Sequence, residues 1–144
     1  MIRSLLVGFD GSEPARKALK FAHDLTVQTH AKLTVLFVME FPRVVPVAPL
    51  DGYFVAAPAH DPRDLEMARK MLEEAVADLP PAEVMQQVTV GASVADVVCQ
   101  EGARLEVDLI VVGARGRSPG GRWLLGSVSD RIVHHAGRPV AVVH

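Results

Sequence analysis

Short apolar runs alternate along this chain with longer segments in which apolar residues recur at helical spacing. The first run, residues 5–9, stops at Asp10, Gly11 and Ser12, which is typical of a buried strand that enters a turn. In the next segment the apolar residues fall on one face of a helix, and Ser12 is placed to cap that helix. A second apolar run covers residues 33–38. The pattern therefore opens with a strand, a helix and a strand.

The same alternation resumes after a proline-rich stretch. It predicts helices near 63–79, after Ser93 and at about 127–136, and strands at 84–90, 107–112 and 139–143. Ser93 is expected to cap the helix that follows it. The strand at 84–90 carries more polar residues than the others, as suits the edge of a sheet. Strands that alternate with helices predict an α/β fold: one open parallel sheet with helices on both faces.

Residues 41–62 interrupt this order with five prolines among valines, alanines and three aromatic residues. Regular structure is not expected there, because proline removes a backbone donor and fixes φ. The stretch is apolar as well as proline-rich, so we interpret it as a flap or contact surface rather than a solvated linker.

Length and composition narrow the class of protein. A chain of 144 residues suits one domain spanning 1–144, and 49% hydrophobic residues with a mean hydropathy of +0.23 suit a sheet buried on both faces. The formal net charge of −2 predicts no attraction for nucleic acid or an anionic membrane. A single cysteine, Cys99, and no long apolar segment indicate a cytoplasmic protein without a membrane span.

Glycines gather after the strand at 107–112. Gly113 and Gly116 follow that strand, and Gly126 comes just before the last helix. In open α/β sheets, ligands collect beyond the carboxyl ends of the strands, and a helix start offers unpaired N–H groups to an anion. Glycine also lets the backbone approach phosphate oxygens without a Cβ in the way. This placement predicts a phosphate site.

Polar side chains in the same segment fit that prediction. Ser127 and Ser129 offer hydroxyl donors, and Arg115 and Arg117 offer charge-assisted contacts. Ser127 with Asp130 three residues later is also compatible with an ordinary helix cap, and both interpretations hold together because a capped helix start still presents N–H groups.

The spacing Gly113-x2-Gly116-x9-Gly126-Ser127 resembles the nucleotide signature of ATP-binding universal stress proteins. The flanking segments 108–112, 124–128 and 139–143 agree with that family, as does the opening strand-Asp10-Gly11-Ser12-helix. The resemblance covers the chain apart from the variable proline-rich loop.

The resemblance implies a Rossmann-like fold of the adenine-nucleotide α-hydrolase type, with strand order 3-2-1-4-5 and the nucleotide between the first and fourth strands. It implies ATP with Mg²⁺ as the cofactor. Asp10 would bond the ribose or help hold Mg²⁺, and the backbone of Val38 would contact the adenine edge. Val112 stands where the family often has methionine. The residues expected around the phosphates are Gly113, Gly116, Arg117, Gly126, Ser127, Val128 and Ser129.

For function, the resemblance implies a nucleotide-dependent regulatory or sensor module in stress response, with at most weak ATP hydrolysis and no catalytic residue. Two alternatives remain. One is a slow ATPase or adenylate-kinase-like enzyme in which Arg115 or Arg117 stabilises the transferring phosphoryl group. The other is a stress-response dimer that binds no nucleotide. The family also implies a homodimer through the edge strand from Pro139 to Val143.

Other nucleotide and hydrolase chemistries lack their motifs here. The sequence has no Gly-x4-Gly-Lys-Ser/Thr loop and no Gly-x-Gly-x-x-Gly after Gly113, and Ser127 is not in a nucleophile elbow. His134 and His135 are adjacent rather than three or four residues apart, so they are not expected to form a metal pair. Trp123 is expected to be a packing anchor or dimer contact.

Overall fold

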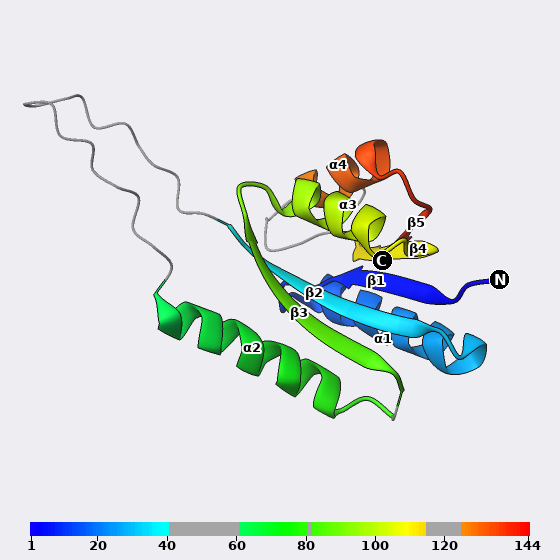
Figure 1. Ribbon diagram of the computed structural model, residues 1–144, viewed down its shortest axis with the longest axis horizontal. Helices are drawn as coiled ribbons and strands as arrows, with labels where there is room; N and C mark the ends of the chain where they lie inside the picture. Colours follow the sequence, from blue (N-terminus) through cyan, green and yellow to red (C-terminus); the bar gives the residue numbers. More distant parts are fainter. Residues whose placement is uncertain (41–60, 81, 115–124) are drawn as a thin grey trace, which may run out of the picture.

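Five parallel strands form one sheet in the computed structural model, which describes residues 1–40, 61–80, 82–114 and 125–144 (Figure 1). The strands lie in the order β3-β2-β1-β4-β5. Both the parallel sheet and the order implied by the family resemblance are therefore confirmed. The chain crosses from one half of the sheet to the other between β3 and β4, so β1 and β4 are neighbours at the point where the order reverses.

The elements follow one another nearly as the hydrophobic pattern predicts. They are β1 (Ser4–Gly8), α1 (Glu13–Thr29), β2 (Lys32–Glu40), α2 (Pro62–Ala77), β3 (Val84–Gly91), α3 (Val94–Arg104), β4 (Leu109–Gly113), α4 (Ser127–His135) and β5 (Val140–Val143). Strand β2 runs two residues beyond the predicted end at Val38, because it pairs with β3 as far as Glu40. The predicted edge position of the polar strand β3 is confirmed.

Both faces of the sheet are buried, which explains why the strands read as continuous apolar runs rather than as alternating ones. Leu5, Val7 and Leu33 face one side, under α1 and α2 (Figure 1). Leu6 and Ile110 face the other side, under α3 and α4. Each of these five side chains is fully buried.

Side-chain caps fix where three of the helices begin. Ser12 and Ser93 each accept a hydrogen bond from the backbone N–H three residues further on, as predicted for α1 and α3. Asp61 caps α2 in a similar way, so Pro62 is the first residue of that helix and not the last residue of the proline-rich loop. Residues 41–60 of that loop lie outside the described residues.

The carboxyl end of β4 lies against the first turn of α1. A Cβ added to Gly113 would lie 2.6 Å from the carbonyl carbon of Pro14 and 2.7 Å from its carbonyl oxygen. Backbone atoms of a helix cannot turn aside as a flexible side chain can. Packing alone therefore requires glycine at position 113.

Asp108 is the one charged residue of the segment 107–112, and its hydrogen bonds explain why a carboxylate stands there. Its Oδ2 accepts hydrogen bonds from the backbone N–H groups of Arg3, at 2.7 Å, and Ser4, at 3.1 Å. These bonds, that from Arg3 first, lower the pKa of the Asp108 carboxyl below its usual value. Asp108 thus joins the amino ends of β1 and β4, at the opposite end of the sheet from the glycines.

We expect Gly113→Ala to lower the free energy of unfolding by about 1–3 kcal/mol in the absence of any ligand, because the new methyl group overlaps the Pro14 backbone. Gly8→Ala is the matched control. A Cβ at Gly8 would have its nearest neighbours at 3.7 Å, an ordinary contact, so stability should change little. Urea denaturation of both variants measures the difference, and equal stability of the two would refute the packing argument.

We expect Asp108→Asn to be less stable than the unaltered chain at neutral pH, because an amide accepts the Arg3 and Ser4 bonds without a charge. A carboxyl whose pKa is lowered in the folded state stabilises the fold above its unfolded pKa, and this contribution is lost as the pH falls through the folded pKa. The difference in the free energy of unfolding between the two proteins should therefore disappear on acidification. Denaturation at a series of pH values tests this, and a gap that stays constant down to strongly acidic pH would contradict it.

Candidate functional site

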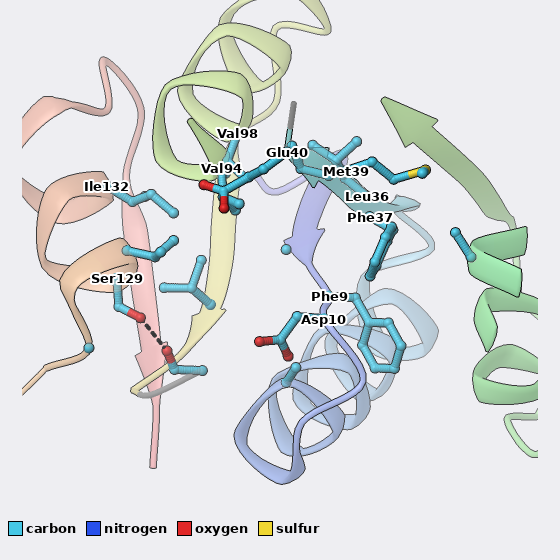
Figure 2. Close-up of a pocket in the computed structure, with 18 of the residues that line it drawn as sticks. Phe9, Asp10, Leu36, Phe37, Met39, Glu40, Val94, Val98, Ser129 and Ile132 are labelled. Carbon is cyan, nitrogen blue, oxygen red and sulfur yellow. Dashed lines mark hydrogen bonds between the residues drawn. The ribbon is translucent and has the colours of Figure 1, made fainter. Parts of the chain in front are cut away.

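A cavity of about 700 Å³ opens at the carboxyl ends of the strands (Figure 2). It lies where β1 and β4 meet at the reversal of strand order, and β2, α2, α3 and α4 also contribute to its walls. Its volume is within the range of small-molecule and cofactor sites. This is the position at which open α/β sheets bind their ligands.

Most of the residues predicted to bind the ligand line this cavity. They are Asp10, Val38, Val112, Gly113, Gly126, Ser127, Val128 and Ser129. The remaining two, Gly116 and Arg117, lie outside the described residues, as do Arg115 and Trp123. The fold therefore brings together residues from the start, the middle and the end of the chain.

Helix α4 points its amino end at the cavity. Gly126 is its N-cap residue, with φ −62° and ψ 152°, and no side chain caps this helix start within the described part of the chain. The N–H groups of a first helical turn have no partner inside the helix, and the helix dipole adds a partial positive charge there. Ser127 and Val128, which lie in this turn, line the cavity. The arrangement can receive an anion.

The Ser129 hydroxyl points at the end of β4 rather than at open space. It donates a hydrogen bond of 2.6 Å to the carbonyl oxygen of Gly113 (Figure 2). A hydroxyl has one proton, so it cannot donate to a ligand while this bond stands. Ser129 lines the cavity, as expected for a residue of the site. Its hydroxyl proton, however, is directed at Gly113, whereas we expected from the sequence that it would be directed at a phosphate.

Asp10 lies in the loop between β1 and α1, with its carboxylate beside the cavity (Figure 2). Its Oδ1 accepts a 2.9 Å hydrogen bond from the N–H of Ser12, which fixes the side chain over the turn into α1. Gly11 within this turn has φ 79°, a conformation that favours glycine. The second carboxylate oxygen, Oδ2, can contact a ligand or a cation.

The sequence pattern missed the wall that α2 and the end of β2 supply. Phe37 and Met39 from β2 and Met67 from α2 line this apolar part of the cavity. Met67 is 70% exposed and lies off the apolar stripe that packs α2 on the sheet. An exposed methionine off the stripe was the one available signal, and it is weak because single exposed apolar residues are common.

Charge in the described lining is negative. Glu40 and Asp64 line the cavity together with Asp10, and no lysine or arginine is among the described residues that do so. Attraction for an anion comes, within this part of the chain, from backbone N–H groups and the α4 dipole.

Other candidate residues lie apart from the cavity. His134 and His135 are in the last turn of α4, as predicted, and Nδ1 of His134 is 2.8 Å from the carbonyl oxygen of Asp130. The described residues contain no group of three side chains that could hold a metal ion.

Cys99 is partly buried in α3, and burial raises the pKa of its thiol. No helix formed by the described residues is long and apolar enough to cross a bilayer.

The family model of the universal stress protein family matches residues 1–144 of this chain. A universal stress protein of Thermus aquaticus, encoded in the QAH/OAS sulfhydrylase 3′ region, is 31% identical over 143 residues, which cover 99% of each chain.

Two solved structures have the same fold. One is the universal stress protein of Archaeoglobus fulgidus in complex with dAMP, with a TM-score of 0.72, 21% identity and full coverage of both chains. The other is a universal stress protein in complex with cAMP, with a TM-score of 0.66 and 23% identity over 99% of this chain and 97% of that one. From the family match over its whole length and the relative in Thermus aquaticus, the chain belongs to the universal stress protein family.

Proposed function

We propose that this protein binds an adenine nucleotide, ATP with Mg²⁺, at the carboxyl edge of its sheet, and that it acts in the cytoplasm as a nucleotide-dependent regulatory or sensor module in stress response. The observation that carries the proposal is the cavity between β1 and β4, onto which the start of α4 opens without a side-chain cap from any described residue. The dAMP and cAMP complexes of two proteins of the same fold support the adenine class of ligand.

The chemistry of the cavity wall suits the parts of such a ligand. The apolar side chains of Val38 and Val112 are almost fully buried and suit the faces of a base, while the backbone of Val38 is the group proposed to contact the adenine edge. The amides at Ser127 and Val128 suit phosphate oxygens. Gly116 and Arg117 are proposed to complete the phosphate site.

The three carboxylates of the lining favour a nucleotide that carries Mg²⁺ over a bare polyphosphate. Asp10, Glu40 and Asp64 would repel four phosphate charges, and a divalent cation lowers that charge. Asp10 has an oxygen beyond the one bonded to Ser12, and carboxylate oxygen is a ligand that Mg²⁺ prefers. Mg²⁺ would screen phosphate charge and orient the chain of phosphates.

Affinity must come from several parts of the site together. Micromolar binding requires about 8 kcal/mol. A helix start supplies at most about 2 kcal/mol of it. Burial of the base and several backbone donors have to provide most of the rest, so no single side chain should be indispensable.

We further propose a homodimer that pairs through β5. In a parallel ladder, alternate residues turn their N–H and C=O groups to the same neighbour. The carbonyl oxygens of Pro139 and Val143 accept bonds from Ile110 and Ala114 on the β4 side, so Val140 and Val142 turn their backbone groups to the open edge. An uncharged edge of this kind is suited to antiparallel pairing with a second copy.

Gly126→Asp should reduce the affinity for Mg·ATP by about a hundredfold or more, because it places a negative charge where phosphate is proposed to lie. The backbone of Gly126, at φ −62° and ψ 152°, suits aspartate as an N-cap, so the variant should fold with no loss of stability. Gly126→Asn is the matched neutral control, and it should bind more tightly than the aspartate variant. Calorimetry measures the affinities, and thermal melting measures stability.

Analysis of the nucleotide that co-purifies with the protein distinguishes a binding module from an enzyme. Chromatography of small molecules released from denatured, freshly purified protein should recover an intact adenine nucleotide. Nucleotide hydrolysed during incubation would move the protein to the enzyme class. No heat with Mg·ATP, or equal affinity of the aspartate variant and the unaltered chain, would overturn the proposal.

Val142→Pro should convert the dimer to a monomer while leaving the fold intact. Proline removes the N–H that Val142 turns outward, and it costs no bond to β4. Val142→Ala retains that N–H and serves as the control that should remain dimeric. Light scattering at micromolar concentration gives the mass of each protein. A monomeric unaltered chain, or a dimeric proline variant, would contradict pairing through β5.

A further inference from the structure

Ser129 is the buried polar residue of α4 and lies on the face of the first turn that meets the sheet. Its exposed fraction is 5%, and its hydroxyl donates the 2.6 Å hydrogen bond to the carbonyl oxygen of Gly113 described above. Gly113 is the last residue of β4. The side chain of Ser129 therefore fastens the start of the helix to the end of the central strand.

Only one other described bond joins these two segments. The N–H of Gly126 donates to the carbonyl oxygen of Ala114 at 2.7 Å. The N–H of Ala114 in turn donates to Val143 on β5 at 2.7 Å, so the strand end is itself fixed within the sheet. Of the two bonds between α4 and the end of β4, the backbone bond survives any non-proline substitution. The Ser129 bond alone can be removed by changing a side chain.

The two bonds have different effects on the direction of the helix. The Gly126 bond holds the N-cap residue at one point, about which the helix start can still tilt. The Ser129 bond lies three residues further along, on the inner side of the same turn, and a second point of attachment prevents that tilt. The N–H groups between the two points belong to Ser127, Val128 and Ser129, all of which line the cavity.

We propose that Ser129 is a positioning residue for the phosphates: its hydroxyl bond to Gly113 sets the direction of the α4 amides and makes no direct hydrogen bond to the ligand. This inference rests on the proposed nucleotide site. Donors for a charged ligand act best when their direction is fixed before binding, because no reorganisation is then needed. Loss of the bond therefore affects the phosphate half of the site, and the base half, built on β2 and β4, keeps its geometry.

Ser129→Ala removes the bond, and Ser129→Cys weakens it with less change in packing, because a thiol is a poor donor. Both variants should bind Mg·ATP about tenfold or more weakly and bind adenosine within about twofold of the unaltered chain, as measured by calorimetry. Ser129→Thr keeps the hydroxyl and should bind ATP as tightly as the unaltered chain does. Thr26→Val is the control: it removes a buried hydroxyl that bonds to Ala22 within α1, away from the cavity.

A purely structural role would give another pattern. It would lower the affinities for ATP and adenosine equally, and Thr26→Val would then resemble Ser129→Ala. That outcome, or unchanged ATP affinity in the alanine and cysteine variants, would overturn the inference.

Hydrogen exchange in the ligand-free protein tests the positioning without any nucleotide. The amides of Gly126 and Asp130, which donate to the carbonyl oxygens of Ala114 and Gly126, should exchange faster in Ser129→Ala than in the unaltered chain, and those of α3 should not. If the unaltered chain binds neither ATP nor adenosine, the proposed function has failed. Unchanged exchange at Gly126 and Asp130 would show separately that Ser129 does not fix the helix start.

Discussion

The end of β4 is the point on which the rest of the site depends. It is held from two sides: α1 packs so closely that position 113 has no room for a Cβ, and α4 is bonded to the carbonyl groups of Gly113 and Ala114. A strand end fixed in this way gives the two helices a common reference. The amides of α4 and the carboxylate of Asp10 consequently face one cavity although they come from opposite ends of the chain.

Burial of the sheet on both faces allows the end of β4 to be held in one position. The two apolar layers, one under α1 and α2 and one under α3 and α4, leave the strand ends as the place where polar backbone groups can meet a ligand. Asp108 performs the corresponding task at the opposite end, where it ties the amino ends of β1 and β4. Polar side chains thus fix both ends of the central strands, and apolar packing fixes their middles.

Periodicity and turn residues predicted the strands, the helices and two of the caps, because burial on one helical face or on both sheet faces leaves a direct trace in the sequence. The glycine spacing picked out two residues, Gly113 and Gly126, that the fold brings to one cavity. The contribution of α2 could not be predicted, since Asp64 and Met67 reach the cavity through tertiary packing and follow no local pattern. The direction of the Ser129 hydroxyl was also beyond prediction, because a serine in a first helical turn can face either a ligand or the sheet.

The contact between Gly113 and Pro14 changes how the glycine signature should be interpreted in relatives. Gly113 is demanded by the approach of two backbones, so a relative that had lost its ligand would still keep this glycine. Gly126 is different, because its backbone conformation suits serine, asparagine and aspartate equally well. During divergence, position 113 is therefore held by the architecture alone, whereas position 126 is free to gain a side chain in any relative that has no need of the proposed ligand.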